Sequence, residues 1–253
     1  MTRLNTIKEG TGPVIVLSHA LGCDLGMWEA VAAELKQSFC VLRFDQRGHG
    51  KSEVPPAPYS MEALADDVAE LIASQAGGAA HFVGLSMGGM VAQQVAVRHP
   101  QRVRSLVIAN SSASQDAASR AMWQARAATV LDQGVAAIAE GSMQRWFTPE
   151  FRAQHPDQVA AMRKILEATD PKGYAATCDA ISRIDFRSSN AGIACPALVI
   201  AGSRDQATPP AMSEEIRASI PGSRMATLDA AHLSAVERPA EFARLVADFV
   251  GAL

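Results

Sequence analysis

The sequence has few aromatic residues and little excess charge of either sign. Phe, Trp and Tyr make up 5% of the 253 residues, which argues against a surface that stacks bases or binds a polymer through aromatic rings. Lys and Arg number 23 against 26 Asp and Glu, a formal net charge of −3. Nucleic-acid binding needs a basic stripe or patch. We therefore predict no nucleic-acid partner.

Long apolar runs and patterned cysteines are also missing. No run approaches the roughly 20 apolar residues that span a bilayer, and the opening MTRLNTIKEGTGP lacks the apolar core of a signal peptide. The four cysteines show neither a CxxC pair nor the spacing of metal ligands. They are Cys23, Cys40, Cys178 and Cys195. We expect reduced, mostly buried thiols in a cytoplasmic protein with no membrane contact and no metal.

Short apolar runs alternate with amphipathic stretches through the first 110 residues. The runs are typical of strands buried on both faces, and they fall at 13–19, 39–45, 80–85 and 103–109. The stretches between them predict helices at 27–37, 60–75 and 87–99. This order predicts an α/β fold, with a mostly parallel sheet flanked by crossover helices.

The alternation stops at 114–192, where helical patterns are broken by Gly and Pro, and it resumes with an apolar run at 196–201. We expect a core domain made of 1–113 and 193–253, and an all-helical cap, or lid, at 114–192. The cap holds nine basic and nine acidic residues, so the net charge of −3 belongs to the core. Recognition of an anionic substrate would then depend on one or two placed arginines.

The most informative motif is Gly84-Leu85-Ser86-Met87-Gly88, a G-x-S-x-G match between a predicted strand and a predicted helix. A sharp strand-to-helix turn of this kind exposes the serine hydroxyl and needs glycine where backbones approach closely. A glycine-rich dinucleotide turn is the alternative, but G-x-G-x-x-G is absent there. Ser86 is therefore the predicted nucleophile.

A serine nucleophile needs a base and an orienting carboxylate, which follow it in that fold in the order Ser, acid, His. Asp205 follows the apolar run PALVIA, and His232 follows a predicted strand at 224–228. Asp45 is the rival acid, but its strand precedes Ser86, and we expect it to bond within its own loop. The predicted oxyanion hole is formed by the backbone N–H groups of Leu21 and Met87.

With Ser86, Asp205 and His232 placed, the chain resembles the α/β-hydrolase superfamily over nearly its full length. The segments SHALGCDLGMW, FDQRGHGKS, GLSMGGMVAQ, RWFTPEF and DAAHLSAVERP are similar to those of 3-oxoadipate enol-lactonases. The resemblance implies a cofactor-free enzyme of the β-ketoadipate pathway of aromatic catabolism, opening a small enol-lactone that bears an acetate group. Two features depart from the family: only twelve residues precede Pro13, which predicts a trimmed sheet edge, and His19-Ala20-Leu21 replaces the common His-Gly.

A substrate carboxylate would need a cation in the cap, and arginine suits that role. Trp123 and Arg126 fall on one helix face, and Arg126 is the first candidate for this cation. Arg145, Trp146 and Phe147 are the other residues of the cap that we consider for substrate binding. These side chains are otherwise solvated arginines and cap-core aromatics. Trp28 could form a pocket wall or anchor its helix.

Three functions remain open at this point. The first is a serine hydrolase that opens a lactone or ester through an acyl-serine. The second is a general small-ester carboxylesterase or perhydrolase of the same fold. The third is a binding protein that retains the fold without turnover.

Overall fold

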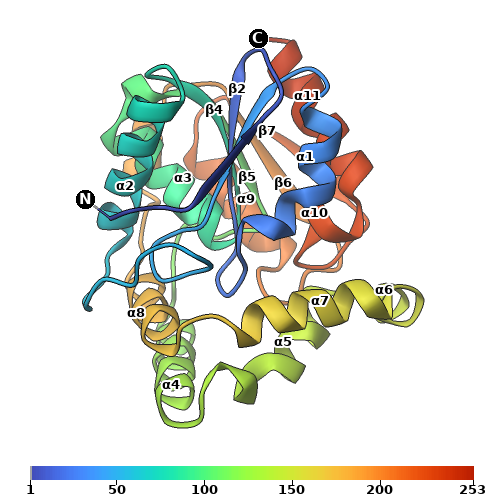
Figure 1. Ribbon diagram of the computed structural model, residues 1–253. Coiled ribbons are helices and arrows are strands. Elements are labelled where there is room, and N and C mark those ends of the chain that lie inside the picture. Colours follow the sequence, from blue (N-terminus) through green and yellow to red (C-terminus); the bar gives the residue numbers. More distant parts are fainter. Residues whose placement is uncertain (1) are drawn as a thin grey trace.

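The computed structural model describes residues 2–253 and contains a seven-stranded sheet with the order β1-β3-β2-β4-β5-β6-β7 (Figure 1). All neighbouring strands are parallel except β1, which pairs antiparallel with β3. The strands are β1 (Thr6–Glu9), β2 (Val14–Ser18), β3 (Cys40–Phe44), β4 (Ala80–Leu85), β5 (Val103–Ala109), β6 (Ala197–Gly202) and β7 (Arg224–Leu228). The predicted α/β fold with a mostly parallel sheet is confirmed.

Helices cover both faces of the sheet (Figure 1). On one face α1 (Glu29–Leu35) contacts α11 (Pro239–Gly251), and on the other α2 (Met61–Gln75) contacts α3 (Met87–Arg98). Ser60 is the N-cap of α2, since its Oγ accepts a hydrogen bond from the Ala63 N–H. Two further helices, α9 (Pro210–Ser219) and α10 (Ser234–Glu237), follow β6 and β7.

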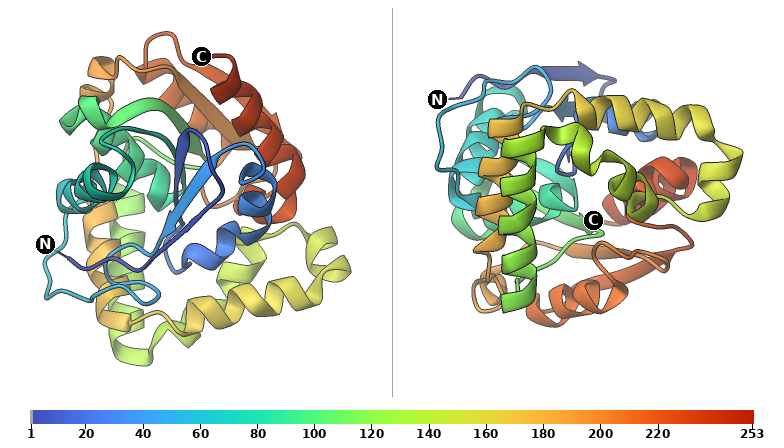
Figure 2. Two further views of the ribbon diagram at one scale, coloured as in Figure 1. Left: turned by 45° about the horizontal axis from the view of Figure 1, so that its top comes forward. Right: turned by 90° about the horizontal axis from the view of Figure 1, so that it is seen from below.

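An all-helical insertion lies between β5 and β6 at one end of the sheet (Figure 1). The first and last of its helices, α4 and α8, run side by side, and the shorter ones extend away from them (Figure 2). Its helices are α4 (Ala117–Gln133), α5 (Ala139–Trp146), α6 (Pro149–Gln154), α7 (Pro156–Glu167) and α8 (Pro171–Ser182). Ser114 and Asp185 form an isolated antiparallel bridge, so the two ends of the insertion meet at its base.

The N-terminal edge of the sheet is short but present. β1 has four residues and pairs with all but the first residue of β3, from Thr6 opposite Phe44 to Glu9 opposite Val41. Only this edge strand runs against the others. Within residues 2–253, no helix combines the length and the apolar character needed to cross a membrane.

Candidate active site

Ser86 lies in a tight turn that joins β4 directly to α3. Its backbone has φ 57° and ψ −116°, a left-handed conformation that few non-glycine residues adopt. The turn requires glycine on both sides: a Cβ on Gly84 would lie 2.1 Å from the Gly88 carbonyl oxygen, and one on Gly88 would lie 2.1 Å from that of Ser18. The motif glycines are therefore explained by backbone contact, and the turn exposes the Ser86 hydroxyl at the carboxyl edge of the sheet.

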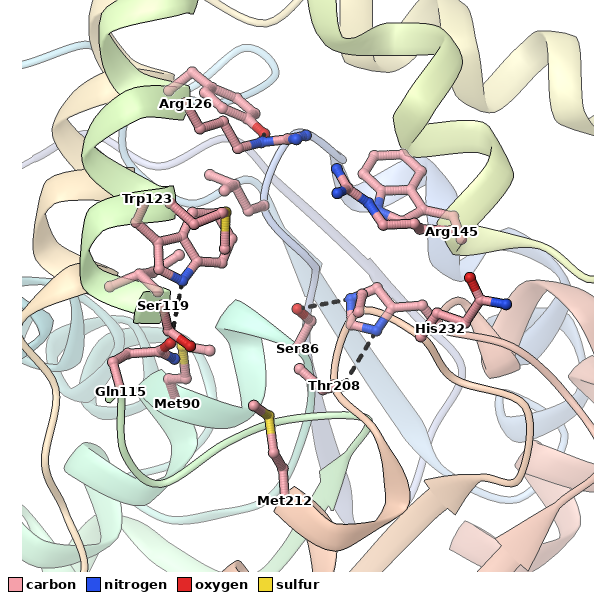
Figure 3. A pocket seen from close by; sticks show the side chains of 17 residues that line it. Ser86, Met90, Gln115, Ser119, Trp123, Arg126, Arg145, Thr208, Met212 and His232 are labelled. Atoms are coloured by element: carbon pink, nitrogen blue, oxygen red, sulfur yellow. Dashed lines mark hydrogen bonds between the residues drawn. The ribbon is translucent and has the colours of Figure 1, made fainter. Parts of the chain in front are cut away.

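The structure brings Ser86, His232 and Asp205 into one hydrogen-bonded chain (Figure 3 shows the first two). Nε2 of His232 lies 2.9 Å from Oγ of Ser86, and Nδ1 lies 2.9 Å from Oδ2 of Asp205. Because a carboxylate only accepts, Nδ1 carries the proton and Nε2 is free to take the proton of the serine hydroxyl. All three side chains are buried, so this series of hydrogen bonds can activate Ser86 for attack on a carbonyl.

Asp205 has further partners that the sequence did not reveal. Oδ2 accepts hydrogen bonds from Asn110 Nδ2 at 3.0 Å and from Thr208 Oγ1 at 2.7 Å, while Oδ1 accepts the N–H groups of Ala207 and Thr208. Burial alone would raise the pKa of Asp205, but the charge of His232 and these hydrogen bonds hold the pKa below its ordinary value. The carboxylate therefore stays charged and keeps the imidazole oriented.

Asn110 and Thr208 carried weak signals in the sequence. Asn110 directly follows β5, at the same edge as Ser86, and its φ of 47° suits asparagine better than most residues. Its Oδ1 also accepts from Ser234 Oγ at 2.6 Å, which ties the loops after β5 and β7 together. Thr208 could be found only from its position three residues after Asp205.

The oxyanion donors predicted from the sequence are the backbone N–H groups of Leu21 and Met87. Within residues 2–253, neither the Leu21 N–H nor the Met87 N–H has a hydrogen-bond acceptor. Met87 is the first residue of α3, so the positive end of the helix dipole adds to its N–H. Leu21 lines the same pocket as Ser86 and His232. Two free donors beside a nucleophile can stabilise a negative oxygen.

His19 fixes the peptide that carries the Leu21 N–H. The Gln46 N–H donates to Nε2 of His19 at 2.9 Å, so Nδ1 is the donor to the Ala20 carbonyl oxygen at 2.8 Å. This carbonyl and the Leu21 N–H belong to one peptide group and point in opposite directions. Burial lowers the pKa of His19, which favours the neutral ring that this pattern needs.

Asp45, the rival acid, lies elsewhere. It accepts the N–H groups of Leu25 and Lys51 and the Nδ2 of Asn5. The hydrogen bond from Lys51 is the expected one within its own loop, and the other two tie this loop to Asn5 and Leu25. It has no hydrogen bond to His232.

A pocket of about 170 Å³ opens above Ser86, between the sheet and the insertion (Figure 3). Its walls are mostly apolar, with no acidic side chain among them. The lining residues are Leu21, Ser86, Met90, Gln115, Ser119, Met122, Trp123, Arg126, Arg145, Trp146, Tyr174, Ile181, Gln206, Ala207, Thr208, Met212 and His232. Of the predicted pocket residues, Trp123, Arg126, Arg145 and Trp146 are present and Trp28 and Phe147 are not.

Of the two roles expected for Trp28, the structure shows the helix anchor, because Trp28 does not line the pocket. Trp28 ends a 3-10 turn before α1 and is fully buried, with its ring centroid 5.6 Å from that of Phe242 in α11. Its ring thus packs the start of α1 against α11. Phe147 is also buried, stacked on Phe151.

The two pocket arginines differ in their partners. Arg126 Nε donates to the Tyr174 hydroxyl at 2.8 Å and an Nη donates to Ser142 Oγ at 2.7 Å. Within residues 2–253, Arg145 has no hydrogen-bond acceptor, and neither arginine has an acidic partner within 4.0 Å. Burial, together with repulsion from Arg126, lowers the pKa of Arg145. Arg145 is therefore the cation more available to a ligand, although the sequence favoured Arg126.

Comparison with known proteins identifies the family to which this protein belongs. The chain belongs to the α/β hydrolase fold family, whose sequence model matches residues 13–239. It is 35% identical to 3-oxoadipate enol-lactonase 2 of Acinetobacter baylyi over 237 residues, covering 94% of this chain and 88% of that protein. The protein is thus an α/β-fold hydrolase related to enol-lactonases.

Solved structures agree and widen the set of relatives. An enol-lactonase from Burkholderia xenovorans superimposes with a TM-score of 0.95 at 39% identity, covering 99% of this chain and 97% of that one. A thermophilic esterase from Thermogutta terrifontis superimposes with a TM-score of 0.93 at 29% identity, covering 99% and 94%. Both lactonases and esterases are therefore related to this hydrolase.

Proposed function

We propose that this protein hydrolyses a small lactone that carries a carboxylate, with 3-oxoadipate enol-lactone as the substrate that fits best. The observation that carries the proposal is the position of Arg126 and Arg145 above the hydrogen-bonded pair Ser86 and His232 (Figure 3). Two cations with no acidic partner in residues 2–253 line the pocket into which the nucleophile opens. Such a pocket favours an anionic ligand.

In the first half of the reaction, Oγ of Ser86 attacks the lactone carbonyl while Nε2 of His232 takes the hydroxyl proton. The Leu21 and Met87 N–H groups bind the negative oxygen of the tetrahedral intermediate. When the ring C–O bond breaks, the leaving enolate oxygen takes the proton back from His232. The product of this half-reaction is an acyl-serine whose acyl chain contains an enol, which tautomerises to a ketone, and ends in the side-chain carboxylate.

In the second half, His232 removes a proton from water, and the resulting nucleophile attacks the acyl-serine carbonyl. The same two N–H groups hold the second oxyanion. Collapse of this intermediate returns the proton to Oγ of Ser86 and frees a carboxylic acid. Asp205 stays ionised throughout, holds Nδ1–H in place and stabilises the imidazolium.

Residues of the insertion bind the side-chain carboxylate of the lactone. The planar guanidinium of Arg145 can donate two parallel hydrogen bonds to a carboxylate, and Arg126 adds positive charge from the opposite wall. A cavity of about 170 Å³ favours a small acyl group, and the relatives named enol-lactonases agree with this substrate class.

Hydrolysis of small neutral esters is the second candidate. The apolar walls formed by Trp123, Met122 and Met212, together with the esterase relative, favour it. Neutral esters would use the same Ser86 and His232 but would gain nothing from Arg145.

The test is turnover of 3-oxoadipate enol-lactone beside a panel of neutral lactones and short esters, with product formation followed by NMR. The proposal expects efficient release of 3-oxoadipate by the wild type. A wide preference for neutral esters would contradict the lactonase assignment while leaving the serine mechanism in place. No turnover of p-nitrophenyl acetate or of any panel member by folded protein would favour a binding protein.

A further inference from the structure

Hydrogen bonds link the residues on either side of His232 to the insertion, directly from Leu233 and through Glu237 from Ala231. The Leu233 N–H donates to the Trp146 carbonyl oxygen at 3.0 Å. On the other side, Oε2 of Glu237 accepts the Ala231 N–H at 2.7 Å, and Oε1 of the same carboxylate accepts the Thr148 N–H at 2.5 Å. The backbone around the base is therefore tied to the segment between α5 and α6.

The Glu237 carboxylate forms a bridge between the Ala231 and Thr148 N–H groups from a buried position. It is the last residue of α10, and only 7% of its surface is exposed. Within residues 2–253 it forms no ion pair, so two backbone N–H groups are the partners that offset its burial. Hydrogen bonds to a charged acceptor are roughly twice as strong as neutral ones. The carboxylate thus joins two backbone segments that lie far apart in the sequence.

The two segments carry the two halves of the proposed site. Ala231 directly precedes His232, the base. Thr148 follows Arg145 and Trp146, which line the pocket wall opposite Ser86. A shift of one segment is therefore transmitted to the other through the buried Glu237 side chain and the hydrogen bond from Leu233 to Trp146.

We propose that Glu237 is a positioning residue. It fixes the position of the His232 imidazole relative to the pocket wall that Arg145 and Trp146 form. It touches neither the substrate nor the reacting atoms, and it acts through the Ala231 and Thr148 peptides. The kinetic part of this inference rests on the proposed function. The spectroscopic part does not, because it concerns the free protein.

Two substitutions remove the bridge from opposite ends. Glu237→Gln leaves one acceptor oxygen and turns an amide NH₂ toward the second N–H. Thr148→Pro removes the donor itself, and the site tolerates proline: Thr148 has φ −61° and Phe147 before it has φ −130° and ψ 144°. Thr148 Oγ1 also caps α6 by accepting from Phe151, so Thr148→Ala, which loses the cap but keeps the N–H, is the matched reference.

Asp170→Asn controls for the loss of a carboxylate that accepts backbone N–H groups elsewhere in the insertion. Asp170 Oδ1 accepts from Lys172 and Gly173 at the start of α8 and does not line the pocket. Its substitution removes the charge of such a carboxylate without touching the His232 loop, while the remaining Oδ1 can still cap α8. A merely structural role of Glu237 would give the same result as Asp170→Asn.

The measurements are kcat on the lactone and, in the free protein, the NMR resonance of the Nδ1 proton that His232 shares with Asp205. We expect Glu237→Gln to lower kcat by about ten- to a hundredfold and to shift that resonance. Thr148→Pro should have kcat about tenfold below that of Thr148→Ala. Equal kcat and equal resonances in the two Thr148 variants would overturn the proposal. The comparison of these two variants tests the proposal even if Glu237→Gln fails to fold.

Discussion

The guanidinium groups of Arg126 and Arg145 point toward each other from opposite walls of the pocket, above Ser86 (Figure 3). Each is attached to the insertion, on α4 and α5 respectively. Like charges repel in a partly dry site, and this repulsion contributes to the lowered pKa of Arg145. An anion between the two groups would relieve the repulsion, and we therefore propose that the pair recognises a substrate carboxylate.

Arg145→Met should weaken the enzyme against anionic substrates only. Without the Arg145 guanidinium, we expect KM for 3-oxoadipate enol-lactone to rise by about ten- to a hundredfold, since a partly buried charge pair with the substrate is lost. Turnover of p-nitrophenyl acetate should stay close to that of the wild type. Lys164→Met, which removes a cation of the insertion outside the pocket, is the control; steady-state kinetics on both substrates distinguish the cases.

Arg126→Met should combine a binding defect with a structural one. Arg126 also donates to Tyr174 and Ser142, so its loss leaves these groups without their partner. We expect a rise in KM together with a loss of roughly 1–3 kcal/mol in the free energy of unfolding. Chemical denaturation of the two arginine variants measures the difference; equal stabilities would contradict the distinct partners of the two side chains.

Ser86→Ala should abolish catalysis while leaving the fold intact. Removing the nucleophile of a triad costs roughly 10⁴-fold or more in kcat. The alanine also relieves no strain, because φ of 57° disfavours it as much as serine. A rate like that of the wild type would show that another group performs the chemistry.

His19→Gln tests the geometry of the oxyanion hole. The variant loses the contact that orients the Ala20–Leu21 peptide, so we expect kcat to fall by about tenfold or more with KM little changed. His81→Gln is the matched control, because His81 bonds to Ser105 in the sheet and does not line the pocket. A parallel rise in KM with unchanged kcat would place the role of His19 in substrate binding instead.

Stability should fall as the pH drops below about 6.5, the ordinary pKa of histidine. Burial, then repulsion from His19, lowers the pKa of His49 to about 3, so the folded state keeps this ring neutral. Between pH 6.5 and 3 the unfolded chain binds a proton at His49 that the folded chain does not, and stability declines with falling pH. The loss at pH 5 amounts to about 2 kcal/mol from His49.

The measurement is Tm as a function of pH for the wild type and for His49→Gln. The variant should show a shallower decline between pH 6.5 and 5, because its side chain does not titrate. Asp205, whose pKa is held low, adds a loss only below its ordinary value of 3.8. Identical slopes in the two proteins would refute the assignment of the decline to His49.

The sheet and the nucleophile could be predicted because local patterns determine them. Buried strands read as apolar runs, and the turn at Ser86 needs glycines that the sequence displays. Asp205 and His232 were then found from the order Ser, acid, His that is typical of this fold, and both lie after parallel strands that end at the same edge. None of this depends on how distant side chains pack.

Side-chain partners could not be predicted in this way. Trp28 was a candidate pocket wall because of its place in the chain, but its ring packs inward on Phe242 of the C-terminal helix, a contact between distant segments. The choice between Arg126 and Arg145 depended on Tyr174 and Ser142, which satisfy one arginine and not the other. Such pairings require the three-dimensional arrangement of the insertion.

The most direct test of the account compares two enol-lactones that share one ring and differ in one group. In α-angelica lactone a methyl group replaces the acetate side chain of 3-oxoadipate enol-lactone. The account predicts that the wild type prefers the acetate-bearing lactone in kcat/KM by about thirtyfold or more, and that Arg145→Met removes most of this preference. A wild-type ratio at or below unity would contradict carboxylate recognition by this pocket.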